Sequence, residues 1–296
     1  MKEKPFSKYQ ILANAVMIIW TLAIILPFIL LFMSSITDEN TLVANGYSFF
    51  PKKFSLASYS YIIKSGGQIL KAYGVSIGVT VVGTLLNVLL SALMAYPLSV
   101  KNLPGRNVMM FFVFFTMLFN GGIVPSYIMW TGTFHIKDTI FAQLLPNFLL
   151  SAWNVMMIRT YFTTSIPDGL YEAAEIDGAS QFTIFWKIVL PLGKPILVPM
   201  GTFAGLAYWN DWTNGLYYIV KNTGLYNVQN LLNQMVQNIQ FLTQSSNSNV
   251  TAAASTIPAT GIQMAIAFVA ILPIMLIFPS FQKYYAKGIA LGAVKG

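Results

Sequence analysis

Residues 11–33 read ILANAVMIIWTLAIILPFILLFM, a run of 23 residues that contains no charged side chain. A transmembrane helix needs about 20 consecutive apolar residues, so this stretch is long enough to cross a bilayer. It is also longer than the apolar core of a secretory signal peptide, and no convincing cleavage site of small residues follows it. The stretch therefore predicts a membrane-spanning helix that is retained in the protein.

The composition indicates that much of the chain resembles this stretch. Hydrophobic residues make up 56% of the 296 residues and charged residues only 9%, whereas about a quarter of an ordinary soluble domain is charged. The same values exclude intrinsic disorder, which requires low hydrophobicity and high charge. They predict an all-α polytopic membrane protein of one domain, residues 1–296, with six transmembrane helices at about 11–33, 75–97, 107–129, 139–161, 195–219 and 259–281.

The positions of Lys and Arg predict the orientation of the chain. With the N-terminus inside, 11 of the 17 basic residues fall in inner segments and six in outer segments. Because cytoplasmic loops carry the excess of basic residues, both termini are expected in the cytoplasm. This orientation makes 34–74 and 220–258 extracellular loops and 162–194 a cytoplasmic loop. The basic residues are scattered rather than clustered, which argues against nucleic-acid binding.

The cytoplasmic loop contains the most informative sequence, SIPDGLYEAAEIDGASQFTIFWKIVLP at residues 165–191. Ser165 followed by Asp168 has the spacing of a helix start, in which the Ser165 hydroxyl accepts an amide hydrogen of the first turn. Gly178 can take the left-handed conformation that ends a helix. Two short helices are therefore expected, over residues 166–177 and 181–189, the second ending at Leu190-Pro191.

Four of the nine acidic residues of the chain lie in this loop. One interpretation is that acids near a helix N-terminus complement its dipole, by about 0.3–1 kcal/mol each. The other is a docking helix that offers carboxylates to a basic pocket of a partner protein. Asp168, Glu172 and Glu175 share one stripe of the expected helix, and the small residues Ala173 and Ala174 lie on another face. The residues by themselves leave this choice open.

The loop resembles the EAA motif of the permease subunits of ATP-binding-cassette (ABC) importers. The resemblance covers Glu172, Ala173, Ala174, Asp177, Gly178, Ile188, Leu190 and Pro191. Further stretches are similar to the carbohydrate-uptake branch of this family, near the maltose-type second permease and the lipoprotein/polysaccharide-type permeases; they are 115–125, 157–162, 208–212 and 288–296. The likeness extends over nearly the whole chain, with Asp211 as a departure, because the family pattern has a smaller polar residue there.

This resemblance implies a type I importer permease fold and a role in ATP-driven, binding-protein-dependent uptake of carbohydrate, as oligosaccharide or polysaccharide fragments. The loop would form a coupling helix in a cleft of a separate ATPase, where Glu172 would pair with a basic residue. Ala173 and Ala174 would fit the cleft, and Gly178 would turn the chain. The resemblance also implies the cytoplasmic membrane of a prokaryote and these partners: a homologous second permease subunit, two ATPase subunits that bind ATP and Mg, an extracellular solute-binding protein, the carbohydrate and membrane lipid.

The sequence lacks the common catalytic and nucleotide-binding motifs. A phosphate-binding loop needs Ser or Thr after Gly-Lys, but Gly193-Lys194 is followed by Pro195. The single histidine, His135, excludes a zinc motif built on two histidines, and the absence of cysteine excludes thiolate sites. The chain is therefore expected not to be an enzyme and to bind no cofactor itself.

Polar and aromatic residues near the outer ends of spans are candidates for the translocation pathway. The alternatives are interhelical hydrogen bonds for the amides and an interfacial belt for the tryptophans. One of the candidates, Asp211, is expected near the outer membrane boundary, where water could hydrate it. The candidates are Asn120, Trp209, Asn210, Asp211 and Trp212.

Glycines predict where helices approach each other or bend. Gly74-x-x-x-Gly78 and Gly201-x-x-x-Gly205 allow two helices to come close, because no side chain separates the backbones. The third predicted span is expected to bend at Gly121, Gly122 and Pro125, where neighbouring protein must satisfy the freed backbone.

Two other classes of function stay open on the residues alone. An ion-coupled secondary carrier usually has a carboxylate near the middle of the membrane, and the predicted spans have none there. A non-transporting scaffold or receptor subunit would show no substrate-dependent ATP hydrolysis in its assembled complex.

Overall fold

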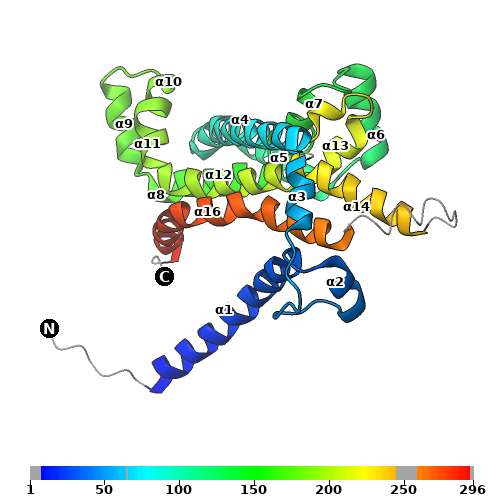
Figure 1. Cartoon of the computed structure of the whole chain (residues 1–296). Helices are drawn as coiled ribbons and strands as arrows, with labels where there is room; N and C mark the ends of the chain where they lie inside the picture. Colours follow the sequence, from blue (N-terminus) through cyan, green and yellow to red (C-terminus); the bar gives the residue numbers. More distant parts are fainter. Residues whose placement is uncertain (1–7, 65, 245–258, 294–296) are drawn as a thin grey trace. The chain divides into compact units, whose positions relative to one another are not determined.

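The structure is a computed structural model that describes residues 8–64, 66–244 and 259–293. Helices dominate these residues (Figure 1), and the only extended pairing among them is an isolated bridge between Thr37 and Phe54. The all-α class predicted from the sequence is thus confirmed for the described part of the chain. Contacts divide the chain into two compact units, one from Met1–Ile69 and Leu232–Pro273 and the other from Leu70–Leu231 and Ile274–Gly296.

The first unit begins with α1 (Lys8–Ser35), which contains the first predicted span. Its apolar side chains are exposed along most of the helix, as for Trp20 at 65%, and a long exposed apolar surface of this kind suits contact with lipid. The short helices α2 (Glu39–Asn45) and α3 (Ala57–Lys64) follow. The hydroxyls of Ser35 and Tyr59 lie 2.8 Å apart and join the end of α1 to α3.

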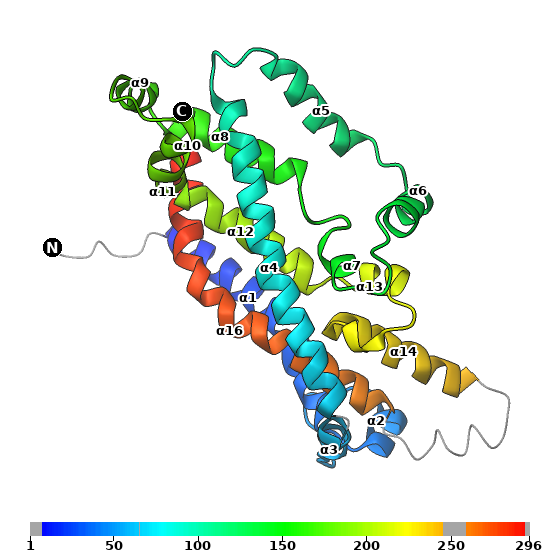
Figure 2. The same cartoon turned by 90° about the horizontal axis from the view of Figure 1, so that it is seen from above.

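The remaining helices lie mostly in the second unit, and α14 and α16 contribute to both units. Figure 2 shows α4 running beside α8 and α12. The helices are α4 (Gly66–Ser99), α5 (Arg106–Leu118), α6 (Ile123–Ile128), the π-helix η1 (Met129–Thr133), α7 (Phe141–Leu144), α8 (Ala152–Ser165), α9 (Asp168–Ile176), α10 (Gln181–Ile184), the π-helix η2 (Phe185–Val189), α11 (Leu190–Leu192), α12 (Lys194–Trp209), α13 (Thr213–Tyr218), the 3-10 helix η3 (Thr223–Leu225), α14 (Val228–Gln244) and α16 (Ala259–Ala293).

Three helices in the described residues are long and apolar enough to cross a membrane alone, and they match three predicted spans: α1, α4 and Thr260–Ile277 of α16. Two bent pairs of helices meet the same criteria together. Arg106–Leu118 and Ile123–Thr133 bend by 111°, and Gln181–Leu192 and Lys194–Trp209 bend by 80°. By length and composition, the described residues therefore contain three candidate crossings, or up to five if each bent pair is one crossing.

The third predicted span, 107–129, is broken near the glycines where a bend was expected. α5 ends at Leu118, and α6 begins only at Ile123. Gly122 has a φ of 87°, which favours glycine, and its amide donates to Oδ1 of Asn120 at 2.9 Å. The expected bend is confirmed, and the span is two helices rather than one.

The fourth predicted span, 139–161, is not one continuous helix. α7 ends at Leu144 and α8 begins at Ala152. Between them Pro146 offers no amide hydrogen, and Asn147 takes a left-handed conformation with φ of 67°. The side-chain amide of Asn147 donates to Asn214 Oδ1 at 3.1 Å, so a tertiary contact helps to hold the break.

The fifth predicted span, 195–219, is also interrupted, because α12 ends at Trp209 and α13 begins at Thr213. The 80° bend before α12 lies at Gly193. A Cβ atom on Gly193 would lie 2.7 Å from Cε1 of Phe162 and 2.9 Å from the carbonyl oxygen of Val189. This corner therefore has no room for a side chain.

The two glycine pairs predicted to permit close approach differ. A Cβ on Gly201 would lie 3.2 Å from Cγ2 of Val88, and a Cβ on Gly205 would lie 3.2 Å from Oγ1 of Thr84. The expected close approach is confirmed for this pair, which packs α12 against α4. Positions 74 and 78 of α4 have no described atom within 4 Å of an added Cβ, so this pair faces open space in the structure.

Candidate functional site

The residues 162–194, called the inner segment below, fold onto one hydrophobic core with the end of α4. Buried members include Tyr96 of α4, Phe162 of α8, Ala174 of α9 and Phe185 of η2. The inner segment is therefore a packed part of the second unit, in which each short helix has a buried face and an exposed face.

Helix α9 begins at Asp168, directly after Pro167, and ends at Ile176. The predicted start was two residues too early, and the expected capping by Ser165 is wrong because Ser165 is the last residue of α8. Proline favours this position because it disfavours helical conformation in the preceding residue. The predicted end is confirmed: Gly178 has a φ of 75°, and the amide of Ala179 donates to Ala174 O at 2.9 Å.

The second short helix also differs from the prediction. Ser180 accepts the amide hydrogen of Thr183 at 3.2 Å and so caps the start of α10. The helical path then continues through η2 and α11 to Leu192, beyond the predicted end at Leu190-Pro191. Pro191 is tolerated because the π-turns of η2 close before it and α11 begins afresh there, where a first-turn amide needs no helical partner.

The residues that resemble the EAA motif divide between surface and core. Ala174 is only 8% exposed and packs in the hydrophobic core described above, which is called the inner core below. The adjacent Ala173 is exposed. Ile188 and Leu190 are half-buried against the same core. A partner protein can reach the exposed group, which consists of Glu172, Ala173, Asp177, Gly178 and Pro191.

The carboxylates of α9 have different surroundings. Asp168 forms an ion pair with Lys101, whose Nζ lies 2.5 Å from Oδ2. Glu175 Oε1 accepts a hydrogen bond from the side-chain amide of Gln181 at 2.8 Å. Glu172 makes no ion pair with any described residue. Of these three, Glu172 is the carboxylate that stays available for an external cation.

Sequence reasoning missed three exposed apolar side chains of the inner segment. Ile176 is 87% exposed, Phe182 is 67% exposed and Trp186 is 43% exposed. The rings of Phe182 and Trp186 contact each other edge to face, with centroids 5.9 Å apart. The available signal was Ile176, an apolar residue on the acidic side of α9. An amphipathic surface helix normally carries polar residues on that side.

The outer candidates do not form one site. Trp209 is 7% exposed and Asp211 is 5% exposed, while Asn210, Trp212 and Asn120 are exposed. Asn120 belongs to the bend between α5 and α6, where its Oδ1 already accepts the amide of Gly122. The structure therefore groups only residues 209–212, and it splits that group between interior and surface.

Asp211 makes hydrogen bonds that support the start of α13. Its Oδ1 accepts hydrogen bonds from the Thr213 amide at 3.0 Å, the Thr213 hydroxyl at 2.7 Å and the Asn214 amide at 3.3 Å. A carboxylate that accepts these amides satisfies the first turn of α13. The expected contact with water is wrong, because the side chain is buried, and Oδ2 has no hydrogen-bond partner among the described residues.

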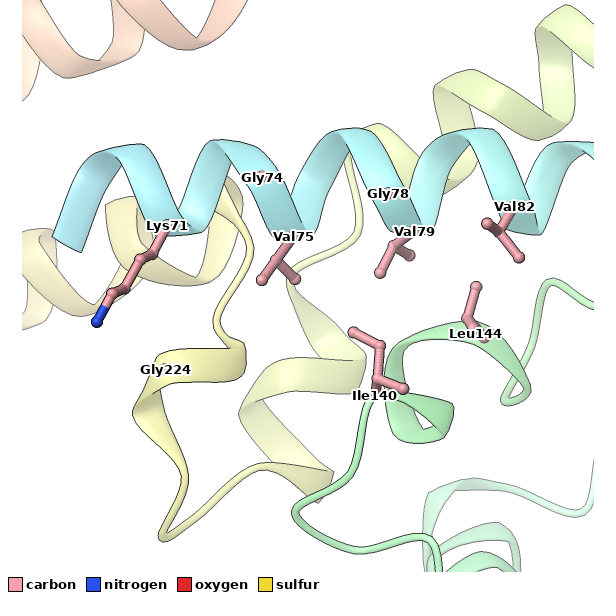
Figure 3. A pocket seen from close by; sticks show the side chains of 9 residues that line it. All are labelled: Lys71, Gly74, Val75, Gly78, Val79, Val82, Ile140, Leu144 and Gly224. Carbon is pink, nitrogen blue, oxygen red and sulfur yellow. The ribbon is translucent and has the colours of Figure 1, made fainter. Parts of the chain in front are cut away.

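A hollow of about 560 Å³ lies along the first half of α4 (Figure 3). Gly74 and Gly78, the open pair of small residues, form part of its wall, and Lys71 is its one charged lining residue. Its other lining residues are mostly apolar: Val75, Val79, Val82, Ile140, Leu144 and Gly224. Such a lining offers few hydrogen-bonding groups for a sugar. In the described part of the chain, no three His, Cys, Asp or Glu side chains lie close enough to hold a metal ion.

Comparisons with known proteins agree with this arrangement. Residues 72–291 match the family described as binding-protein-dependent transport system inner membrane component. Protein LplC of Bacillus subtilis (strain 168) is 36% identical over 272 residues, which cover 92% of this chain and 90% of LplC. The polygalacturonan/rhamnogalacturonan transport system permease protein YtcP of the same strain is 35% identical over 288 residues, which cover 97% of this chain and 98% of YtcP.

The fold is also similar to that of a solved transporter. In the crystal structure of a bacterial ABC transporter involved in the import of the acidic polysaccharide alginate, one chain matches with a TM-score of 0.79 and 25% identity. The match covers 96% of the present chain and 100% of that chain. The chain therefore has the type I ABC importer permease fold and belongs to the family of binding-protein-dependent transport system inner membrane components.

Proposed function

We propose that this chain is a transmembrane subunit of an ATP-driven importer of carbohydrate and forms half of the translocation path beside a homologous permease subunit. The observation that carries the proposal is the likeness in fold to the alginate importer chain over 96% of the present chain. In this proposal ATP and Mg bind to two separate ATPase subunits, and an extracellular solute-binding protein delivers the sugar.

The proposed topology has six crossings in one permease domain, with both termini in the cytoplasm. The excess of basic residues in inner segments supports this orientation. The bent pair α5–α6 with η1, the broken α7–α8 region and the interrupted pair α12–α13 account for the crossings that are not single long helices. Irregular backbone is tolerated at membrane depth where protein satisfies it.

The proposed docking surface on the ATPase combines one charge with apolar groups. It consists of Glu172, Ala173, Ile176, Phe182 and Trp186. Glu172 lacks an ion pair with a described residue, so a basic residue of the ATPase can approach it. The exposed apolar side chains would be covered on docking, as in the centre of a protein–protein interface.

The substrate class is proposed from relatives whose names state what they transport. YtcP is named for polygalacturonan and rhamnogalacturonan, and the solved transporter for alginate. All three are polysaccharides, which supports oligosaccharide or polysaccharide fragments as the cargo. Nothing in the mainly apolar hollow beside α4 favours a particular sugar.

The first test is gentle purification of the tagged chain from its native membrane, followed by mass spectrometry of what accompanies it. An ATPase, a second permease and a solute-binding protein are expected. The binding protein can then be screened against oligosaccharides from digests of polygalacturonan and alginate. Reproducible recovery of the chain alone would contradict the proposal and favour an ion-coupled carrier, and an assembly without substrate-dependent ATP hydrolysis would favour a scaffold.

The second test reverses the charge of Glu172. Glu172→Lys should reduce the amount of co-purifying ATPase about tenfold or more, because a like charge would then face the basic residue of the partner. Thr164→Lys is the matched control, since Thr164 is also exposed but lies on α8, outside the proposed surface. Equal recovery of the ATPase with both variants would refute the assignment of Glu172.

A further inference from the structure

The inner end of α4 is in direct contact with the helices of the inner segment. Tyr96, one turn before the end of α4, is 8% exposed. Its ring centroid lies 5.5 Å from that of Phe185 in η2 and 6.3 Å from that of Tyr171 in α9. A single side chain of a membrane-spanning helix therefore touches two of the short helices.

The hydroxyl of Tyr96 extends this contact into a chain of hydrogen bonds. It donates to Oε1 of Gln181, the first residue of α10, at 2.5 Å. The side-chain amide of Gln181 then donates to Glu175 Oε1 on α9 at 2.8 Å. Through one glutamine, Tyr96 is joined to both α9 and α10.

A second link between the same regions is weaker. Lys101, just beyond α4, pairs with Asp168 at the start of α9, but the side chains are 61% and 57% exposed. Exposed ion pairs contribute little because water and salt screen them. The hydrogen bond from Tyr96 to Gln181 is partly buried, and the bond from Gln181 to Glu175 is exposed. Both bonds are directional, whereas apolar packing alone allows neighbouring surfaces to slide.

We propose that Tyr96 is a positioning residue that holds α9 and α10 in fixed register with α4, so that displacement of α9 by the ATPase is carried into the membrane along α4. This inference rests on the proposed function, because it requires an ATPase that moves α9. It adds a route by which displacement passes through this chain: the ATPase moves α9, and the movement reaches α4 through Gln181 and Tyr96.

The test measures whether α9 and α4 move as one body. The chain contains no cysteine, so cysteines introduced at two positions are its only sites for thiol spin labels. Leu85 on α4 is 66% exposed, and position 169 on α9 has open space around an added Cβ. The distance between labels on Leu85→Cys and Gly169→Cys would be measured by pulsed electron paramagnetic resonance in the purified complex, before and after trapping with ATP and vanadate.

One unchanged distance is expected in both states of the otherwise native complex. Tyr96→Phe keeps the ring but removes the donor, and after trapping it should raise the population with altered distance about fivefold, the usual effect of one neutral hydrogen bond. Gln181→Ala should have the same effect, and the double variant no more than either single variant. Tyr226→Phe is the control, because it removes a hydroxyl that donates to Ile219 O at 3.4 Å and lies outside both α4 and α9.

Each result separates the two proposals. An unchanged distance in Tyr96→Phe, or a distance that already changes in the native complex, would overturn the role of Tyr96 while ATP hydrolysis by the complex leaves the proposed function standing. A native preparation that contains no ATPase would refute the proposed function, and this inference with it.

Discussion

The carboxylate of Glu39 accepts a hydrogen bond from the backbone amide of Gly261, 222 residues later in the chain, at 2.8 Å. Its other oxygen accepts the amide of Thr260, also at 2.8 Å. Because α16 begins at Ala259, both amides belong to the first turn, which has no helical partners for them. A negative charge there also complements the helix dipole. Within the first unit, the segment after α1 therefore caps a helix from the other end of the chain.

Removal of this cap should destabilise the protein. Glu39→Ala leaves two amides without their acceptor and should lower the free energy of unfolding by about 1–3 kcal/mol. Thermal unfolding in detergent, read as Tm, checks this. Lys53→Ala is the control, because it removes only an ion pair to Asp38 from a lysine that is 70% exposed, and Tm should change little. Equal shifts in the two variants would contradict the capping role.

Gly261 should tolerate a methyl group only if its neighbour shrinks. A Cβ there would lie 2.5 Å from Oγ of Ser58 and 3.1 Å from Oε2 of Glu39. Gly261→Ala should therefore lower Tm through overpacking, by a cost of about 1–3 kcal/mol. The double variant Gly261→Ala/Ser58→Ala should recover part of that loss. This interpretation would be contradicted if the double variant lost more stability than the two single variants lose when their separate losses are added.

Replacement by alanine should have opposite effects on stability at two glycines of α4. A Cβ on Gly83 would overlap the ring of Tyr208, whereas a Cβ on Gly78 meets no described atom within 4 Å. Gly83→Ala should reduce the yield of folded protein and lower Tm. Gly78→Ala should be neutral or stabilising by up to about 1 kcal/mol, because alanine favours helix over glycine. Size-exclusion profiles and Tm of both variants would be compared.

Asp138 should make stability depend on pH. Its Oδ1 accepts the amides of Val220, Lys221 and Asn222 at 2.6, 2.7 and 3.3 Å. The hydrogen bonds from Lys221 and Val220 hold the pKa of the Asp138 carboxyl below its ordinary value. Since the charged form is favoured in the folded state, its contribution is present above that ordinary pKa, about 4, and is lost as the pH falls through the lowered pKa.

The matching variant is Asp138→Asn, which lacks the charge at every pH. The difference in Tm between it and the native chain should be constant between about pH 5 and 8 and should shrink below about pH 4. A difference that persists unchanged at low pH would show that the carboxylate charge is not what binds the three amides.

The apolar part of the proposed docking surface can be tested without changing charge. Phe182→Ala should lower the affinity for the ATPase by about tenfold or more, as for an aromatic residue at the centre of an interface. Phe112 on α5 is similarly exposed, at 61%, and Phe112→Ala is the control because a lipid-facing side chain should not affect docking. Titration of the ATPase onto the permease in nanodiscs gives both values. Equal affinities would remove Phe182 from the surface.

Features governed by local backbone preferences were predictable from the sequence. Gly178 ends α9 in the left-handed conformation, and the bend between α5 and α6 lies at the glycines where it was expected. Glycine is decisive at such places because other residues pay a steric cost there. The apolar length of α1, α4 and α16 was equally readable, since the bilayer requires it.

Features that depend on distant partners were not predictable. Asn147 and Asn214 meet across 67 residues and help to keep α7 and α8 apart as separate helices, although residues 139–161 have the composition of a continuous span. Ala173 and Ala174 are adjacent residues of the same type, yet only Ala174 packs in the inner core. The exposure of Asp211 was misjudged for the same reason, because position along a helix does not reveal what covers it.

The inner core has a consequence for the order of events during synthesis. It joins Tyr96 and Val113 to Ala174, and it is completed by Met200 of α12. The core that includes Ala174 of α9 is not complete until residue 200 has left the ribosome. A nascent chain that stops short of α12 would therefore hold α9 on an incomplete core.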